Sequence, residues 1–389
     1  MITFISMLFN LGYQSLTLLF FVVQILIFAL LLFRKGIINE SSSDKWLSLL
    51  LLLCAMYLAP WMFGHAGWYA HDGYREFLFF VPFHQYFLFG PVMLFLTRSI
   101  TLEQGKLSKK DLLHFIPAGL YFIYTVVVAI GDLLVFEEFY FYADGYDKDL
   151  KPWYQITGLT SMVIYATISL KHYSDYRKRI LQTLSYADSV KLRWLKEFLF
   201  ALVIIIVLRG AFIVILPEIG DWGVKWWYYL IFGAISYYMA IAAWSSSIKH
   251  SALVTNTWDS VEIEEEYKHA VDSLELDDVM QKVNDHFNNE AVYKNPTLSL
   301  PQLAKMMGTN TSILSKAINK RSEFNFNDFV NRYRIEAVKR AIADGELQFK
   351  TLTGLALDAG FNSKSTFIRS FKKLEGMTPS EYIKTTHKS

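Results

Sequence analysis

The sequence predicts an all-α protein in three parts: a bundle of seven membrane-spanning helices, a polar helical connector, and a C-terminal domain of two helix-turn-helix units. Apolar residues make up 53% of the chain, and nearly all of the hydrophobic character lies before residue 245. A short Leu-Ala and Gly pattern then occurs twice, at residues 303–308 and 355–360. We place the three parts at residues 1–250, 251–295 and 296–389.

Seven apolar stretches are long enough to cross a bilayer as helices, which requires about 20 residues. They are residues 13–33, 46–63, 77–96, 115–134, 153–170, 198–216 and 226–244. The N-terminus has neither the basic residues nor the cleavage motif of a signal peptide, so the first stretch is expected to be retained.

Lys and Arg are distributed unevenly among the loops that join these stretches. Loops 34–45, 97–114 and 171–197 hold 14 of them, and the other three loops hold four. Because cytoplasmic loops are enriched in Lys and Arg, we expect the N-terminus outside and, after seven crossings, the C-terminal domain in the cytoplasm. The predicted location is therefore the cytoplasmic (inner) membrane, in contact with the lipid bilayer.

Polar side chains inside apolar stretches are costly in lipid and usually face the protein interior. Arg209 is the clearest case. At a similar depth in other stretches lie Gln24, Tyr57, His84 and Gln85. One hypothesis is that this layer binds a small polar or anionic signal from outside, with Arg209 as its charge partner. The alternative is that Arg209 only pairs with Asp132, or with backbone carbonyls, to hold the bundle together.

Several features argue against catalysis. The single cysteine, Cys54, excludes an intrachain disulfide and a Cys-based metal site. The histidines and nearby acids fit no metal or nucleophile spacing. The acidic loop 137–149 lacks the ligand spacing of a calcium loop and is interpreted as solvated. We therefore expect no catalytic residue, no metal and no cofactor.

The connector is acidic: residues 258–295 carry 11 acidic and 3 basic residues. Apolar residues at helical spacing predict a first amphipathic helix that includes Ile263 and Tyr267, and a second that includes Leu276 and Phe287. The first helix can pair with its copy in a homodimer and transmit movement from the seventh span, or it can fold back on its own domain.

The C-terminal part is basic, with 15 basic and 8 acidic residues in 296–389. In the first unit a helix follows Ser299, Gly308 makes the turn, and a second helix follows Asn310 or Thr311. In the second unit Gly360 makes the turn and Ser363 caps the next helix. Residues 327–343 are predicted to form one long helix that joins the units. This arrangement is typical of double-stranded DNA binding, with two recognition helices in successive major grooves.

The second helix of each unit presents polar residues outward. We expect DNA contacts from Ser312, Ser315, Lys316, Asn319, Ser363, Lys364, Ser365, Arg369, Lys372 and Lys373. Arg pairs well with guanine in the major groove, so Arg369 is favoured as a base-reading residue. Lys372 and Lys373 are expected to contact phosphates. For each residue, the alternative is a solvated helix face without function.

Residues 276–384 resemble the C-terminal domain of AraC/XylS-type transcription regulators. The likeness is carried by Phe329 and Arg334, by the string from Gly360 to Phe367, and by Gly376-Met377-Thr378-Pro379. It implies base contacts from Ser312, Ser315 and Lys316 in the first unit, and from Lys364, Ser365 and Arg369 in the second. The first unit departs from the family pattern at Ile318, where Phe is common. The soluble sugar-binding barrel of that family is absent, so the resemblance implies no effector.

These observations together predict a membrane-embedded one-component transcription regulator, not an enzyme. It would couple an outer-side or intramembrane signal to sequence-specific promoter binding, with RNA polymerase as a candidate partner. The alternative is a membrane enzyme or transporter with an appended DNA-binding regulatory domain.

Overall fold

The computed structural model describes residues 12–101, 108–136, 139–145, 147–187, 193–215, 222–254 and 273–386. Within these residues every regular element is a helix, and an isolated antiparallel bridge joins Leu184 to Ser299. The all-α class is therefore confirmed for the described part of the chain. The chain divides into two compact units: unit 1 is Met1–Ser174 with Arg193–Lys249, and unit 2 is Asp175–Leu192 with His250–Ser389.

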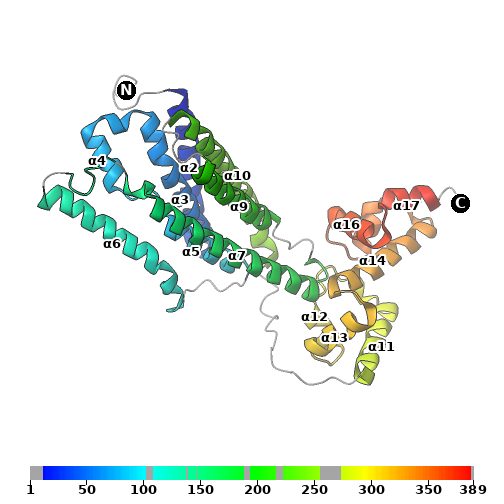
Figure 1. The fold of residues 1–389 in the computed structure, drawn as a ribbon. Helices are drawn as coiled ribbons and strands as arrows, with labels where there is room; N and C mark the ends of the chain where they lie inside the picture. The colour runs from blue at the N-terminus through cyan, green and yellow to red at the C-terminus, as the bar shows by residue number, and fades with distance from the viewer. Residues whose placement is uncertain are drawn as a thin grey trace. The chain divides into compact units, whose positions relative to one another are not determined.

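Unit 1 is a bundle of mostly long helices (Figure 1). It contains α2 (Tyr13–Ile38), α3 (Ser42–His65), α4 (Asp72–Phe80), α5 (Tyr86–Thr101), α6 (Ile116–Ile130), the larger part of α7 (Pro152–Thr183), α9 (Arg193–Ile215) and most of α10 (Trp222–Val254). Short 3₁₀ or π turns are η1 (Trp68–Ala70), η2 (Asp111–Phe115), η3 (Gly131–Val135) and η4 (Lys148–Leu150).

Three helical stretches among the described residues are long and apolar enough to cross a membrane: Tyr13–Ile38, Ser42–His65 and Asp111–Val135. They coincide with the first, second and fourth predicted spans. The last three predicted spans lie within α7, α9 and α10, which are not among these three stretches. The predicted number of seven spans is therefore not confirmed.

The third predicted span, 77–96, is not one continuous helix. Helix α4 ends at Phe80 and α5 begins at Tyr86. Pro82 lies in the break, and proline lacks a backbone N–H and disfavours helical geometry at the preceding residue. Hydrophobicity continues across the break, so the apolar pattern predicted one span, although Pro82 is among the prolines from which a break or kink in a span was expected. As a result, His84 and Gln85 lie at a turn between two helices.

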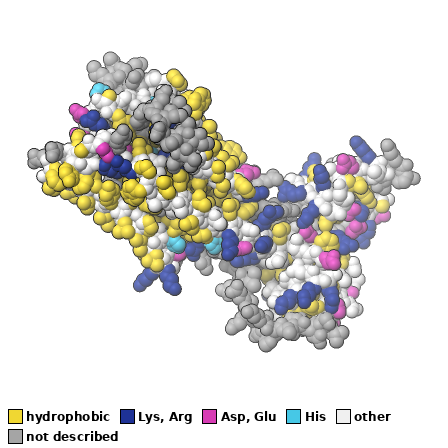
Figure 2. Space-filling view, viewed as in Figure 1, with side chains coloured by type: hydrophobic (Ala, Val, Ile, Leu, Met, Phe, Trp, Pro, Cys, Tyr) yellow, Lys and Arg dark blue, Asp and Glu magenta, His cyan; other side chains and the backbone are white. Residues whose placement is uncertain are grey.

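The helices of unit 1 differ in how much apolar surface they expose. In α3, 72% of the membrane-length window is buried, compared with 28% in α2 and in Asp111–Val135. Helix α3 is thus an inner helix, whereas α2 and α6 expose large side chains such as Phe20, Leu30 and Leu120. Figure 2 shows apolar side chains spread over this unit. Extended exposed apolar surface is typical of contact with a membrane or a partner protein.

Helices α5 and α7 approach each other closely at two glycines. A Cβ atom on Gly90 would lie 2.4 Å from the Tyr165 ring, and one on Gly158 would lie 2.4 Å from the Tyr86 side chain. Each glycine makes room for a tyrosine of the opposite helix, in the way that small residues allow close helix packing in membrane bundles. This packing holds α7 tightly against α5.

Unit 2 contains the end of α7 and the helices of the C-terminal part. They are α11 (Ser273–Asn289), α12 (Leu300–Met306), α13 (Thr311–Ser322), α14 (Phe326–Ala343), α15 (Leu352–Asp358), α16 (Lys364–Glu375) and α17 (Pro379–Thr386), with single turns at η6 (Val292–Lys294) and η7 (Glu346–Gln348).

Two hydrophobic cores in unit 2 share one helix. Phe329 and Val330 of α14 belong to a first core with α11, α12 and α13, and Ile335 and Val338 of the same helix belong to a second core with α15 and α16. The predicted long helix over 327–343 is thus confirmed as α14, and it joins the two helix-turn-helix units rigidly (Figure 1).

The second predicted connector helix is α11. Its residues Leu276, Val283 and Phe287 are buried in the first core. This helix therefore packs onto the first helix-turn-helix unit. The first predicted connector helix, around Ile263 and Tyr267, lies outside the described residues.

Candidate DNA-binding surface and a buried polar cluster

Side-chain caps begin the four helices of the two helix-turn-helix units. The side chains of Ser299, Asn310, Thr351 and Ser363 accept hydrogen bonds from the backbone N–H groups of Gln302, Ile313, Gly354 and Thr366, respectively. Such bonds satisfy N–H groups that the first helical turn leaves without partners. The predicted helix starts after Ser299 and Ser363 are confirmed. Of the two starts predicted for α13, after Asn310 or after Thr311, the structure has the one after Asn310.

The two turns are made by glycines in the left-handed region, with φ of +64° at Gly308 and +98° at Gly360. Only glycine adopts this region without strain. The surroundings of the two glycines differ. A Cβ atom on Gly308 would meet nothing within 4 Å, whereas one on Gly360 would lie 2.7 Å from the carbonyl oxygen of Tyr293. Gly360 therefore serves both a turn and a close backbone approach.

Helix α13 is the second helix of the first helix-turn-helix unit, which lies in unit 2. It buries Leu314, Ala317 and Ile318 in the first core. Its predicted DNA-contacting residues, Ser312, Ser315, Lys316 and Asn319, are all partly exposed. The Asn319 amide donates to the Ser315 hydroxyl at 3.3 Å. This face thus presents hydroxyl, amide and ammonium groups, which suit hydrogen bonding to base edges.

Helix α16 is the second helix of the second helix-turn-helix unit, which also lies in unit 2. It buries Phe367 and Phe371 in the second core. Its predicted contact residues Lys364, Ser365, Arg369 and Lys372 are exposed. This face is more basic than that of α13, and Figure 2 shows Lys and Arg side chains over the visible face of the unit. A basic face of this kind favours phosphate and guanine contacts.

Lys373 and Ser363, two of the predicted contact residues, make close contacts within unit 2. The Lys373 ammonium lies 2.7 Å and 2.5 Å from the two carboxylate oxygens of Asp328 on α14. A DNA phosphate would therefore compete with Asp328 for this side chain, which is 56% exposed. Ser363 is the cap of α16 and its hydroxyl also lies 3.1 Å from that of Ser365.

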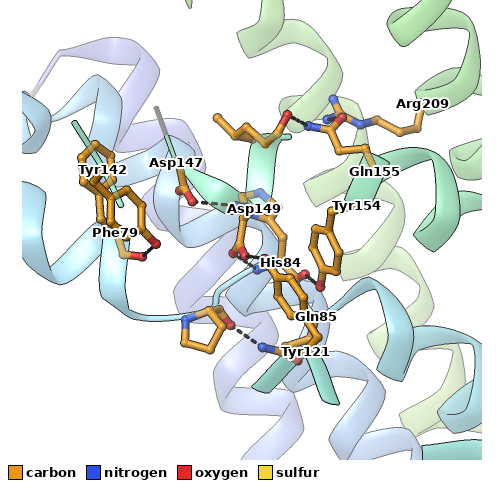
Figure 3. A network of polar contacts seen from close by, with 12 residues as sticks. Phe79, His84, Gln85, Tyr121, Tyr142, Asp147, Asp149, Tyr154, Gln155 and Arg209 are labelled. Carbon is orange, nitrogen blue, oxygen red and sulfur yellow. Dashed lines mark hydrogen bonds and ion pairs between the residues drawn. The ribbon is translucent and has the colours of Figure 1, made fainter. Parts of the chain in front are cut away.

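A cluster of buried polar side chains lies in unit 1 around the break between α4 and α5 (Figure 3). The Asp149 carboxylate accepts from the backbone N–H of His84 at 2.9 Å and from the Tyr121 hydroxyl at 2.5 Å. The Tyr154 hydroxyl donates to the carbonyl of His84 at 2.5 Å. These bonds tie the break to η4, α6 and the first turn of α7.

Arg209 of α9 lies in the same region and is buried. Its Nη2 donates to Gln155 Oε1 at 2.6 Å, and its Nη1 donates to the Tyr229 hydroxyl at 3.4 Å. Its Nε forms no hydrogen bond, and no carboxylate of the described residues forms an ion pair with it. The guanidinium therefore has only neutral oxygens as partners, although it also lies over the Tyr228 ring.

Three of the five predicted pocket residues come together. The Tyr57 ring lies 5.1 Å from the His84 ring and 5.5 Å from the ring of Tyr229, the partner of Arg209. The Tyr57 hydroxyl donates to that of Tyr228 at 3.3 Å. Tyr57, His84 and Arg209 thus surround one aromatic group of side chains.

The other two predicted pocket residues do not join this group by hydrogen bonds. The Gln85 amide, although buried, donates to the carbonyl of Pro82 at 2.7 Å. Gln24 is partly exposed on α2, and no hydrogen bond connects it to the cluster within the described residues. The sequence prediction grouped these residues by their depth along each span. It was wrong for Gln85 and Gln24, because depth alone takes no account of the helix break or of the direction of each side chain.

The alternative in which Arg209 pairs with Asp132 is wrong. The Asp132 carboxylate accepts instead from the backbone N–H groups of Phe141 at 2.9 Å and Tyr142 at 3.3 Å. It therefore orders the loop that follows α6 and has no part in the arginine site.

The interpretation of loop 137–149 as solvated is also wrong for two of its residues. Asp147 and Asp149 are buried, at 6% and 4% exposure. Burial, and then the neighbouring Asp149 carboxylate, raises the pKa of Asp147 well above its ordinary value. A polar, charged loop gave no sign that its end folds inward onto Tyr121 and His84.

Sequence reasoning missed most partners in the cluster. These are Tyr121, Asp149, Tyr154, Gln155 and Tyr229. The polar residues among them lie in or next to apolar stretches, and that signal was used only for Arg209 and its layer. Within the described ranges, no group of three or more His, Cys, Asp or Glu residues is positioned to hold a metal ion.

Comparison with known proteins supports the C-terminal geometry. Residues 303–385 match the sequence model of a helix-turn-helix domain family of the AraC type. An uncharacterized HTH-type transcriptional regulator of Staphylococcus aureus strain COL is 32% identical over 114 residues, which are 29% of this chain and 14% of that protein. The uncharacterized HTH-type transcriptional regulator YtdP of Bacillus subtilis is 29% identical over 106 residues, which are 27% of this chain and 12% of YtdP.

The chain therefore spans only about an eighth of the length of the curated relatives it matches. The residues that match the family model, 303–385, all lie in unit 2. No solved structure matches the chain.

Proposed function

We propose that this protein is a membrane-embedded one-component transcription regulator, in which unit 1 receives a signal and unit 2 binds promoter DNA. The observation that carries the proposal is one chain with two capped helix-turn-helix units and long helices that expose apolar surface. The named relatives, described as HTH-type transcriptional regulators, support the DNA-binding half.

The proposed DNA-binding mode uses α13 and α16 as recognition helices. Helix α14 has 18 residues and is therefore about 27 Å long, at ~1.5 Å per residue. Each half of α14 packs against one helix-turn-helix unit. The resulting distance between the two helix-turn-helix units suits two major grooves about one turn of DNA apart. Arg369 reads a base in this proposal, and Lys372 contacts a phosphate.

The proposed membrane location rests on charge and on exposed surface. Helices α2 and α6 expose apolar side chains along their length. The uneven loop charges favour seven crossings, an outer N-terminus and a cytoplasmic C-terminal unit. This orientation places the helix-turn-helix units on the side of the chromosome.

The proposed signal is a small anion that binds beside Arg209. A buried guanidinium is costly when only neutral oxygens face it, and an anion would supply the missing opposite charge. The Nε atom of Arg209 and the Nε2 atom of His84 are both buried without hydrogen-bond partners in the described residues.

Genome-wide mapping of the DNA sites of the full chain, with alkaline extraction of membranes from the same cells, tests the proposed function. We expect the protein to resist extraction and to occupy discrete promoter sites. Extraction into the soluble fraction would refute the membrane location, and occupancy without any shared sequence would refute specific regulation.

Arg209→Gln tests the signal site. We expect this variant to stay in the membrane and to lose the response of a mapped promoter to growth conditions that alter it in the wild type. Tyr124→Phe is a matched control, because Tyr124 lies in the same unit with its side chain 40% exposed. A lower amount of Arg209→Gln protein with an intact response would show that Arg209 is only structural.

A further inference from the structure

The four residues that follow α7 are built into the C-terminal unit. Leu184 forms an antiparallel bridge with Ser299, and the backbone N–H of Ser185 donates to the carbonyl of Leu298 at 3.1 Å. Leu184, Ser185, Tyr186 and Ala187 are all buried. Ser299 is the cap of α12, so this segment lies directly against the start of the first helix-turn-helix unit.

The same segment is bound by α14, the helix that both units share. The Asn327 amide donates to the carbonyl of Leu184 at 3.2 Å and to that of Ser185 at 2.8 Å. The Arg334 guanidinium donates to the Ser185 carbonyl at 3.4 Å and to its hydroxyl at 3.1 Å. Two side chains of α14 thus hold one short piece of the loop between α7 and α9.

Arg334 links this contact to the stability of unit 2, because its buried charge depends on the acceptors around it. It is 1% exposed, and its remaining bonds go to the carbonyls of Tyr293 and Asn295 and to the Asn331 side chain. Burial lowers the pKa of Arg334 to about 9, so the side chain remains charged at neutral pH. Without Ser185, a buried charge would lose two of its acceptors, and no carboxylate in the described residues replaces them.

Helix α7 connects this segment to the polar cluster of unit 1. Its first turn carries Tyr154, which donates to the His84 carbonyl, and Gln155, which accepts from Arg209. Its last residue, Thr183, directly precedes Leu184. The helix has 32 residues and passes from unit 1 into unit 2. A single helix thus has the candidate signal site at one end and the bound segment at the other.

We propose that α7 and residues 184–187 are the element that transmits the signal, and that they act on α14 through Ser185, Asn327 and Arg334. This proposal rests on the proposed function, and it differs from transmission by the seventh span and the acidic connector alone. When an anion displaces Gln155 from Arg209, α7 shifts and the 184–187 segment moves on α14. Because α14 holds both recognition helices, this movement displaces both of them together on DNA.

The first experiment tests the bound segment in full-length protein in native membranes. Leu184→Cys and Ser299→Cys are combined in a Cys54→Ala background, with a specific protease site inserted after Val261. We expect mild oxidation to form a disulfide that keeps the two fragments together after cleavage. Leu184→Cys with Ser380→Cys is the control, because Ser380 is an exposed residue of α17. Equal linkage in both pairs, or none in the first, would overturn the contact.

The second experiment tests transmission along α7. Ser174 and Asp175 are adjacent exposed residues near the point where α7 passes from unit 1 to unit 2. Glycine at both positions weakens the helix, whereas alanine at both positions strengthens it without changing any buried contact. We expect the glycine pair to abolish the effect of Arg209→Gln on occupancy of a mapped promoter, and the alanine pair to preserve it, a difference of at least about fivefold.

The outcomes separate the two claims. If the wild type occupies specific promoters and the glycine and alanine pairs behave alike at equal protein amounts, transmission through α7 is wrong and the proposed function stands. If no promoter is occupied, the proposed function fails and this inference fails with it. The disulfide still reports the contact in that case, because it does not depend on DNA.

Discussion

The guanidinium Nη2 of Arg334 lies 3.1 Å from the hydroxyl of Ser185, a residue 149 positions earlier in the chain. This hydrogen bond joins the helix shared by both helix-turn-helix units to the loop that follows α7. Arg334 lies within the residues that match the helix-turn-helix family, whereas Ser185, which accepts its hydrogen bond, lies outside them.

Loss of this hydrogen bond should lower the unfolding free energy, and the loss should be larger when more of the buried polar groups around Arg334 are left without partners. We expect Ser185→Ala to cost about 1 kcal/mol of unfolding free energy, because Arg334 keeps the Ser185 carbonyl. Arg334→Lys should cost about 3 kcal/mol, because an ammonium cannot reach acceptors arranged around a guanidinium. Thermal unfolding of the full chain in detergent measures both. Arg340→Lys, at an exposed position of α14, should change little. Comparable losses in all three variants would contradict the assignment.

The two turn glycines should respond very differently to alanine. Gly308→Ala should cost about 1 to 2 kcal/mol, the usual penalty for a side chain in the left-handed region. Gly360→Ala should cost a further ~1 to 3 kcal/mol, because its Cβ would lie 2.7 Å from the backbone oxygen of Tyr293. Tyr293 O also accepts from Arg334 Nε, so a shift of this carbonyl weakens a second contact. Equal melting temperatures for the two variants would argue against this packing.

Base reading and phosphate contact should separate on α16. Arg369→Ala should flatten preference at one base pair of a mapped site and cost about 1 to 3 kcal/mol there. Lys372→Ala should weaken binding to all sequences alike. It should also reduce the slope of log affinity against log salt concentration by about the amount that one phosphate contact contributes. Titrations of specific and random DNA at several salt concentrations distinguish the two. An equal loss on both DNAs for Arg369→Ala would remove it as a specificity residue.

Unit 1 should lose stability as pH rises, because of Asp147. Burial and the nearby Asp149 carboxylate raise the pKa of Asp147 in the folded protein. The folded state therefore binds this proton more tightly than the unfolded state. Stability from this group is complete below the unfolded pKa, about 3.9, and is lost as pH rises through the raised folded pKa.

Asp147→Asn removes the ionisable group and keeps an oxygen that can accept from the backbone N–H of Asp149. We expect this variant to melt at a higher temperature than the wild type at neutral pH and to show a weaker pH dependence. Asp144→Asn is the control, since Asp144 is exposed and pairs with Lys148 and Lys151. A melting temperature of Asp147→Asn below that of the wild type at neutral pH would show that the carboxylate is needed in its charged form.

Local signals in the C-terminal part were reliable. Capping residues, turn glycines and apolar spacing act within a few residues, so Ser299, Asn310, Gly308, Gly360 and Ser363 were located correctly. The long helix α14 was likewise predicted from its own apolar face. In unit 1, long apolar runs located the helices but gave α4 and α5 as one span, because a proline in an apolar run leaves the hydrophobic pattern unchanged. The residue type of Pro82 was the one sign of the break.

The amino-acid sequence by itself determined the all-helical class, the apolar first unit, the basic second unit and the two helix-turn-helix motifs, since these follow from composition and from periodicity within single elements. Only the tertiary structure decided that Asp149 folds inward onto His84, that Arg209 bonds to Gln155, and that Ser185 completes Arg334. The physical reason is the same in each case. A buried polar group takes its partner from whichever segment the fold brings within about 3 Å, and separation along the chain does not predict that distance.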